Sequence, residues 1–128
     1  MLKKMAQGRS SAATMLLLCM LVLYSEMVHA ATYVVGDATG WAYNVNNWPN
    51  GKSFKAGDIL EFKYSPFAHN VIQVDEFGYN TCIPTFNSRL FFSGDDHIQL
   101  AKGLNYFICG FPGHCQLHGM RIAVNATA

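Results

Sequence analysis

Short apolar runs separated by turn residues recur along residues 31–128, and their alternation of apolar and polar positions predicts β-strands. We expect strands at residues 32–35, 59–64, 71–74, 89–92, 97–100, 104–109 and 120–124. Residues 54–58 look like a turn, and the irregular stretch 75–85 is expected to hold a short helical turn. Roughly seven short strands with turn signals between them predict an all-β fold, an antiparallel sandwich or barrel.

A different pattern marks the start of the chain, where a basic segment precedes an apolar run at 15–24 and small or neutral residues stand at Val28 and Ala30. This order is typical of a secretory signal peptide, so we expect residues 1–30 to be removed and 31–128 to form one domain. An uncleaved membrane anchor is the alternative, but the apolar run is too short to span a bilayer comfortably. The chain ends N-A-T-A without an apolar tail, so we expect a secreted, extracellular protein with no membrane anchor.

The charge of the expected mature chain argues against two classes of partner. After removal of residues 1–30, six Lys and Arg and seven Asp and Glu remain, which gives a formal charge of −1 with His neutral. No basic stripe remains that would bind nucleic acid or an anionic membrane. Asn125 begins a sequon for N-glycosylation, N-A-T, whose use the sequence leaves open.

The cysteine count indicates one disulfide and one remaining thiol. Cys19 lies in the expected signal peptide, so the mature chain keeps Cys82, Cys109 and Cys115. An odd count in an oxidising compartment leaves one thiol over, and the sequence alone allows all three pairings. A bridge from Cys82 to Cys115 would leave Cys109 free, whereas a bridge from Cys109 to Cys115 would consume it.

The most informative stretch is C-G-F-P-G-H-C-Q-L-H-G-M, which places Cys109, His114 and Met120 in one short loop. His69, just before the strand expected at 71–74, can supply a fourth ligand. Two His, one Cys and a weak axial Met form the ligand set of a blue-copper site, so we predict one copper ion that alternates between Cu(I) and Cu(II). Zinc is the alternative metal, although Met is not among its usual ligands. His97, by contrast, is expected to be an ordinary surface histidine.

This ligand set predicts electron transfer and not catalysis. An axial Met closes the site, and the Cys–His pair has no obvious acid partner or oxyanion loop, so we do not expect an enzyme. An electron would pass through the exposed edge of His114, which we expect an apolar patch to surround. The expected patch consists of Pro66, Phe67, Phe111 and Pro112. Its partners would be small extracellular redox proteins or small-molecule electron donors and acceptors, and the protein would be a monomer.

Several longer motifs resemble those of the phytocyanins, specifically the plantacyanin or basic blue protein type, over essentially all of residues 31–128. The matching motifs are T-Y-V-V-G-D, W-P-N-G-K-S-F-K-A-G-D, H-N-V-I-Q-V, Y-F-I-C-G-F-P-G-H-C-Q and G-M-R-I-A-V-N-A. The resemblance implies a cupredoxin-like Greek-key β-sandwich with one type 1 copper.

The resemblance also implies roles for individual residues. It implies copper ligands at His69, Cys109, His114 and Met120, and a disulfide between Cys82 and Cys115. It implies that Asn70 ties the two ligand loops together, and that the protein resides in the apoplast or cell wall. Because the family has been linked to cell-wall and pollen-tube guidance, an extracellular signalling or binding module with structural copper is the alternative function.

Two features depart from the family pattern. The gap between Cys115 and the Gly119–Met120 pair is one residue longer than is usual in the family, because it holds Gln116, Leu117 and His118. Met120 therefore comes one position later than expected. Either Gln116 or His118 could therefore compete with Met120 for the axial place. The mature chain is also not basic, so the electrostatic choice of partners does not carry over from the family.

Overall fold

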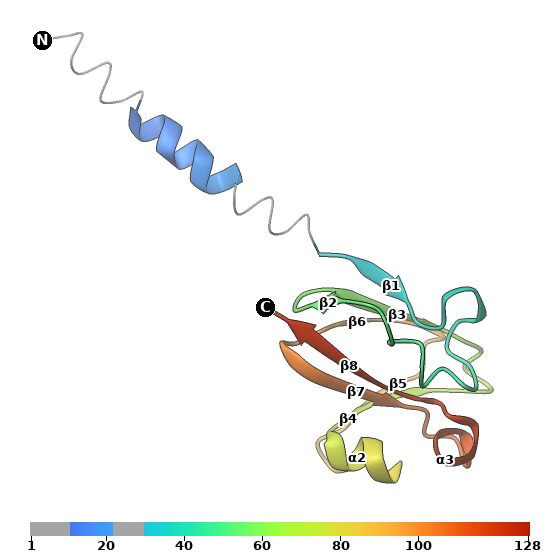
Figure 1. Cartoon of the computed structure of the whole chain (residues 1–128). Coiled ribbons are helices and arrows are strands. Elements are labelled where there is room, and N and C mark those ends of the chain that lie inside the picture. The colour runs from blue at the N-terminus through green and yellow to red at the C-terminus, as the bar shows by residue number, and fades with distance from the viewer. Residues whose placement is uncertain (1–10, 22–29) are drawn as a thin grey trace, which may run out of the picture. The chain divides into compact units, whose positions relative to one another are not determined.

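The computed structural model describes residues 11–21 and 30–128, and the chain divides into two compact units, Met1–Ala31 and Thr32–Ala128 (Figure 1). In the first unit, residues 11–21 form a helix with exposed side chains. No helix within the described ranges is long and apolar enough to cross a membrane. The basic start and most of the predicted cleavage motif lie outside the described residues, so the signal peptide stays a prediction.

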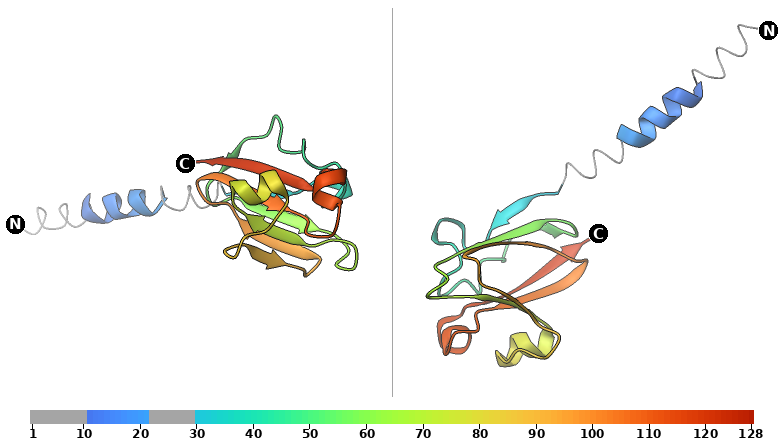
Figure 2. Two further views of the ribbon diagram at one scale, coloured as in Figure 1. Left: turned by 90° about the horizontal axis from the view of Figure 1, so that it is seen from below. Right: turned by 180° about the vertical axis from the view of Figure 1, so that it is seen from behind.

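Two β-sheets make up the second unit (Figures 1 and 2). A three-stranded sheet has the order β1-β3-β6, with the bounds Thr32–Val34, Ile59–Lys63 and Asp95–Gln99. A five-stranded sheet has the order β2-β8-β7-β4-β5, with the bounds Phe54–Lys55, Arg121–Thr127, Gly103–Ile108, Val71–Val74 and Arg89–Phe91. The short helices are η1 Asp37–Thr39, α2 Glu76–Thr81 and α3 His114–His118. Within the described residues the two sheets stay separate, so the predicted all-β sandwich is confirmed and the barrel is not closed.

The strand pairing is mixed, which the apolar pattern did not indicate. β1 pairs in parallel with β3, and β2 pairs in parallel with β8. The other pairings, including Ile72 with Ile108 and Ile108 with Arg121, are antiparallel as predicted. Parallel neighbours need a long connection instead of a tight turn, and residues 35–58 provide it between β1 and β3.

Most predicted elements are present, with shifted ends. β4 has the predicted bounds, and α2 fills the irregular stretch. The differences fall where turn residues and strand residues mix. β2 lies in the turn expected at 54–58, β6 begins at Asp95, two residues before the expected strand, and β8 begins after Met120.

Alternating burial along β3 builds the core between the sheets. Leu60 and Phe62 are fully buried, and the Phe62 ring lies 5.1 Å from the rings of both Trp41 and Phe107. Trp41 is itself buried, and its indole N–H donates to the backbone carbonyl of Asn70 at 2.8 Å. The core is thereby fixed to the segment that enters β4.

A second, smaller core lies under α2, where Val74 and Ile108 pack with Cys115. Asp75 begins α2 by accepting the backbone N–H of Gly78 at 2.8 Å. A side chain at Gly78 would approach Val74 to 2.7 Å, so only glycine allows the helix to lie this close to the sheet. This contact brings the end of α2 near the ligand loop.

We predict that Phe62→Ala lowers the free energy of unfolding by about 3–5 kcal/mol, because it leaves a cavity between two buried aromatic rings. Phe86→Ala is the matched control, since Phe86 is fully exposed and its loss should change the value by less than about 0.5 kcal/mol. Denaturant titrations of both variants measure the difference, and equal effects would contradict the assignment of the core.

Candidate metal centre

The structure brings three of the predicted ligand residues together. The Nδ1 atoms of His69 and His114 lie 3.1 Å apart, and the Sγ atom of Cys109 lies 3.5 Å from the same His114 nitrogen. The three donor groups all lie within 4.8 Å of one another. Soft sulfur and borderline nitrogen donors that converge in this way fit copper or zinc better than a hard cation.

The register of the five-stranded sheet explains why these residues meet. β7 runs antiparallel to both β4 and β8, and Ile108 pairs with Ile72 on one side and with Arg121 on the other. The end of β7 therefore lies beside the starts of its two neighbours. Cys109 follows β7, and His69 precedes β4 at the same end of the sheet. The helix α3 also lies at this end (Figure 1).

Burial affects the protonation of the three donors in different ways. Burial raises the pKa of the Cys109 thiol above its ordinary value. The pKa of His69 is lowered mainly by burial and secondly by the neighbouring His114. The pKa of His114 is lowered mainly by burial and secondly by His118. Both imidazoles are therefore neutral ligands near pH 7, and an ion that binds there displaces the thiol proton.

Met120 lies in the core directly beside these donors. It is fully buried, its N–H donates to the carbonyl of His114 at 3.0 Å, and its carbonyl accepts the N–H of Cys109 at 3.0 Å. Gln116 and His118 are instead exposed on α3. The backbone of Met120 is thus tied to two of the predicted ligands, whereas its two potential competitors face solvent.

The longer loop is accommodated by α3, a helix that we did not predict. The helix begins after Gly113, at φ 78°, and is ended by Gly119, at φ 61°. Both angles are left-handed and favour glycine. A side chain at Gly119 would also approach the Asn46 side chain to 2.9 Å. The residues between His114 and Gly119 therefore form a helical turn, and Met120, which follows it, is buried.

Asn70 joins the two ligand segments, as the resemblance implies. Its side-chain oxygen accepts the backbone N–H of Gly110 at 2.6 Å, while its own carbonyl accepts the Trp41 indole. A Cβ at Gly110 would lie 2.5 Å from the terminal methyl of Ile72 and 3.3 Å from the Asn70 side-chain oxygen, so a larger residue there would require Ile72 to shift. His69 and Cys109, the neighbours of Asn70 and Gly110, are thereby held at a fixed separation.

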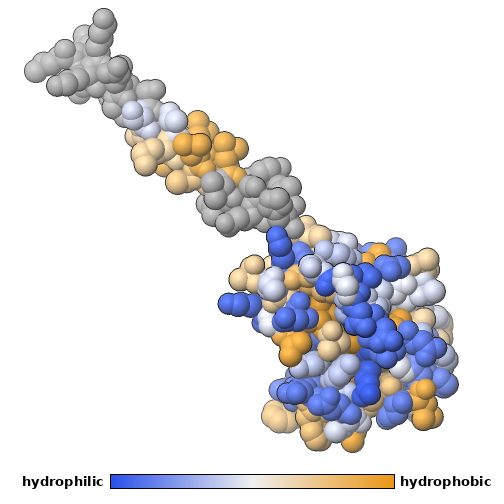
Figure 3. Space-filling view, viewed as in Figure 1, coloured by the Kyte–Doolittle hydropathy of each residue, from blue (hydrophilic) through white to orange (hydrophobic). Residues whose placement is uncertain are grey.

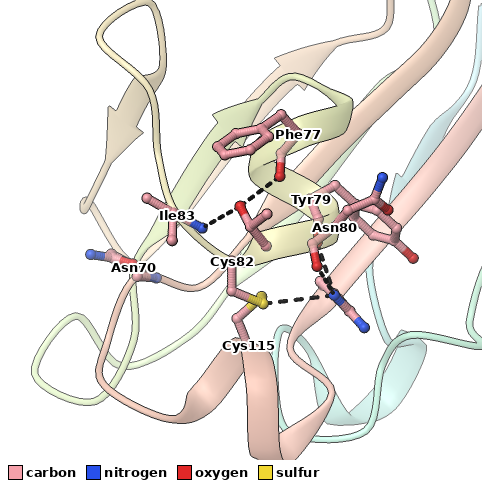
Figure 4. Close-up of a disulfide and its surroundings, with 10 residues drawn as sticks. Asn70, Phe77, Tyr79, Asn80, Cys82, Ile83 and Cys115 are labelled. Atoms are coloured by element: carbon pink, nitrogen blue, oxygen red, sulfur yellow. Dashed lines mark hydrogen bonds between the residues drawn. A yellow bond between two sulfur atoms is a disulfide. The ribbon is translucent and has the colours of Figure 1, made fainter.

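A disulfide joins Cys82, at the end of α2, to Cys115, within α3 (Figure 4). Cys109 remains a buried free thiol. This is the pairing that the resemblance implies. The Arg121 guanidinium donates to the carbonyl of Tyr79 at 2.9 Å and lies 3.7 Å from the Cys82 sulfur. The bridge and these contacts fix the helix that carries His114.

Tyr43 is part of the centre, although the sequence did not identify it. Its hydroxyl lies 3.1 Å from Nε2 of His114, and its ring stacks on His118 with centroids 4.3 Å apart. A tyrosine in a turn-rich segment gives no signal of such a contact, because the loop geometry alone brings it over the ligand loop.

A second group of possible ligands lies on the outer face of the three-stranded sheet. Nε2 of His97 lies 3.0 Å from a Glu61 oxygen and 3.4 Å from an Asp95 oxygen. Lys63 also approaches Glu61, at 3.9 Å. His97 and Asp95 are exposed, and these contacts form a surface network of opposite charges, which is what we expected for His97.

Comparisons with known proteins agree with this geometry. A family profile described as a plastocyanin-like domain matches residues 37–120, a range that contains all four predicted ligands. Chemocyanin of Lilium longiflorum is 49% identical over 127 residues, which cover 96% of this chain and 100% of that protein. The basic blue protein of Arabidopsis thaliana is 46% identical over 130 residues, with 96% and 100% covered. The solved structure of cucumber basic protein, a blue copper protein, has a TM-score of 0.72 and 54% identity, and covers 74% of this chain and 98% of that chain.

We predict that the double variant Cys82→Ala/Cys115→Ala loses about 4 kcal/mol of unfolding free energy, because the bridge closes a loop of 33 residues. The single variant Cys109→Ala removes a cysteine outside the bridge and controls for the loss of a buried sulfur. Denaturant titration of the metal-free proteins measures both. A double variant no less stable than the control would show that the bridge does not stabilise the fold.

Proposed function

The chain belongs to the plastocyanin-like family, as a phytocyanin, and we propose that it is a secreted blue copper protein that carries single electrons between extracellular partners. The proposed ligands are Nδ1 of His69, Nδ1 of His114, Sγ of Cys109 and the thioether of Met120. The observation that carries the proposal is the convergence of both Nδ1 atoms and the free thiol within one small volume.

The donor set fits copper by its chemistry. Two neutral imidazoles and a thiol that becomes a thiolate suit both oxidation states, and a buried thioether suits the weak axial position. Bound copper supplies a centre that alternates between Cu(II) and Cu(I), accepting and releasing one electron. Zinc accepts the first three donors, but its structural sites normally contain more cysteine.

The scaffold supports electron transfer because it holds the donors still. Asn70 fixes the separation of the two ligand segments, and the disulfide at Cys115 fixes the residue next to His114. Ligands that move little between the two oxidation states add little to the barrier for electron transfer. With Met120 buried against the site, no open position is expected at which oxygen or water could react, which favours a carrier over an enzyme.

Exposed apolar side chains in the two ligand segments support the proposal of weak, transient docking of redox partners. Phe67 is 94% exposed and Leu117 is 80% exposed, and the Phe111 ring lies 5.6 Å from that of His114. Figure 3 shows a face of mixed character, with hydrophobic side chains along the lower edge, where α2 and α3 lie in Figure 1, and also elsewhere. Exposed apolar patches can mark interaction sites, and the proposed partners are small redox proteins or small-molecule donors and acceptors.

The proposed location is the extracellular space of a plant tissue, the apoplast or cell wall. The predicted signal peptide, the disulfide and the plant relatives support it, because disulfides persist in oxidising compartments. A signalling module in which copper is structural is the alternative function, and biological activity retained by Cys109→Ser would favour it.

We predict that the copper-loaded protein shows an intense blue absorption band and an EPR spectrum with narrow copper hyperfine splitting, because the Cys109 thiolate bonds to the ion. Cys109→Ser should lose the band. His97→Gln is the matched control, because it removes a histidine from the surface network and should leave the band unchanged. A colourless wild-type protein, or a blue Cys109→Ser protein, would contradict the proposed site.

We predict that Met120→Gln lowers the reduction potential, because an amide oxygen stabilises Cu(II) more than a thioether does. His118→Gln should change the EPR hyperfine splitting less than Met120→Gln does, because the exposed His118 side chain contacts Tyr43 and is not a proposed ligand. Voltammetry and EPR on both variants test the assignment. If His118→Gln altered the EPR spectrum and Met120→Gln altered neither property, His118 would be the axial ligand.

A further inference from the structure

We propose that Tyr43 is a positioning residue for His114, and that His118 holds Tyr43 in place. In this arrangement the Tyr43 hydroxyl accepts a hydrogen bond from Nε2–H of His114, which turns Nδ1 toward the other donors. The inference rests on the proposed function, because it assigns the second ring nitrogen of a proposed ligand.

The two nitrogens of His114 have different neighbours. Nδ1 lies 3.1 Å from Nδ1 of His69 and 3.5 Å from the Cys109 sulfur, whereas Nε2 lies 3.1 Å from the Tyr43 hydroxyl. A neutral imidazole that offers its Nδ1 lone pair to a metal must carry its proton on Nε2. The Tyr43 hydroxyl lies where it can accept the proton on Nε2. In the proposed arrangement it does so, which favours the tautomer that can bind a metal.

Ring contacts hold Tyr43 over the site. Its ring stacks nearly parallel on His118, with an interplanar angle of 19° and a centroid distance of 4.3 Å. It meets the His114 ring edge-on at 5.0 Å and the His69 ring at 5.6 Å. One side of Tyr43 thus packs on His118 while its edges and hydroxyl contact both imidazoles of the site.

The backbone also joins Tyr43 to α3. The neighbouring Asn44 has a left-handed φ of 62°, which asparagine adopts more readily than most residues, and its N–H donates to the carbonyl of His118 at 2.7 Å. His118 therefore contacts this segment through both its backbone and its ring. It belongs to the stretch that makes the ligand loop one residue longer, so the longer loop supplies a support for Tyr43.

The hydrogen bond should strengthen the binding of Cu(II). A partner that accepts the outer N–H of a ligating histidine raises the basicity of its metal-binding nitrogen, and loss of such a partner typically costs 10- to 100-fold in metal affinity. Tyr43 is 45% exposed, so we expect the lower end of that range. If Cu(I) affinity stays constant, a tenfold loss for Cu(II) raises the reduction potential by about 59 mV.

The test compares Tyr43→Phe, which removes only the hydroxyl, with Tyr33→Phe. Tyr33 is the matched control because its hydroxyl donates to the Ser53 carbonyl at 3.3 Å, in contacts that involve none of the proposed ligands. The first readout is the NMR resonance of the His114 Nε2–H proton in the zinc-loaded protein. It should lie downfield, as expected for a hydrogen-bonded proton, in wild type and in Tyr33→Phe. In Tyr43→Phe it should move upfield and exchange faster with water. Competition titrations should show about tenfold weaker Cu(II) binding for Tyr43→Phe alone.

A second variant separates the role of His118. His118→Ala keeps the Tyr43 hydroxyl but removes its stacking partner, and should shift the same NMR signal in the same direction by a smaller amount. If Tyr43→Phe leaves the N–H resonance, the Cu(II) affinity and the potential at their wild-type values, the inference is wrong. If the wild-type protein binds no copper, the proposed function fails instead, and the zinc-loaded spectra still decide whether the hydrogen bond exists.

Discussion

Asn70 is the residue on which the geometry of the centre depends most directly, because it connects the core with both ligand segments. Its carbonyl accepts the indole N–H of the buried Trp41, and its side chain accepts the N–H of Gly110. His69 precedes it in the chain, and Cys109 precedes Gly110. A movement of either ligand segment would therefore break a hydrogen bond that is anchored in the core, which makes the donor spacing a property of the whole sandwich.

The centre also needs this support because the contacts among its donors are few. Two imidazole nitrogens and a thiol lie within 4.8 Å of one another, joined only through Nδ1 of His114. The lowered pKa values of His69 and His114 mean that these rings remain uncharged there. The stability of the fold must come from elsewhere, namely from the aromatic core around Phe62 and from the disulfide.

The sequence predicted the parts of the molecule that depend on local pattern or ligand chemistry. The β4 strand and the all-β class followed from apolar alternation, which left a sandwich or a barrel open, and the family resemblance implied the sandwich. The cysteine, histidine and methionine in one loop indicated the candidate ligands. The parallel pairing of β1 with β3 could not be predicted, because apolar alternation does not encode strand direction. Tyr43 and α3 were missed for a related reason: each depends on how two distant loops fold against each other.

The convergence of the ligands is tested most directly by diffraction at the copper absorption edge from crystals of the copper-loaded protein. One anomalous peak should lie within bonding distance of Nδ1 of His69, Nδ1 of His114 and Sγ of Cys109, with the Met120 sulfur farther away. A peak bonded to Nε2 of His114 would contradict the tautomer assigned here. A peak at Glu61, Asp95 and His97, with Cys109 unbound, would contradict the centre itself.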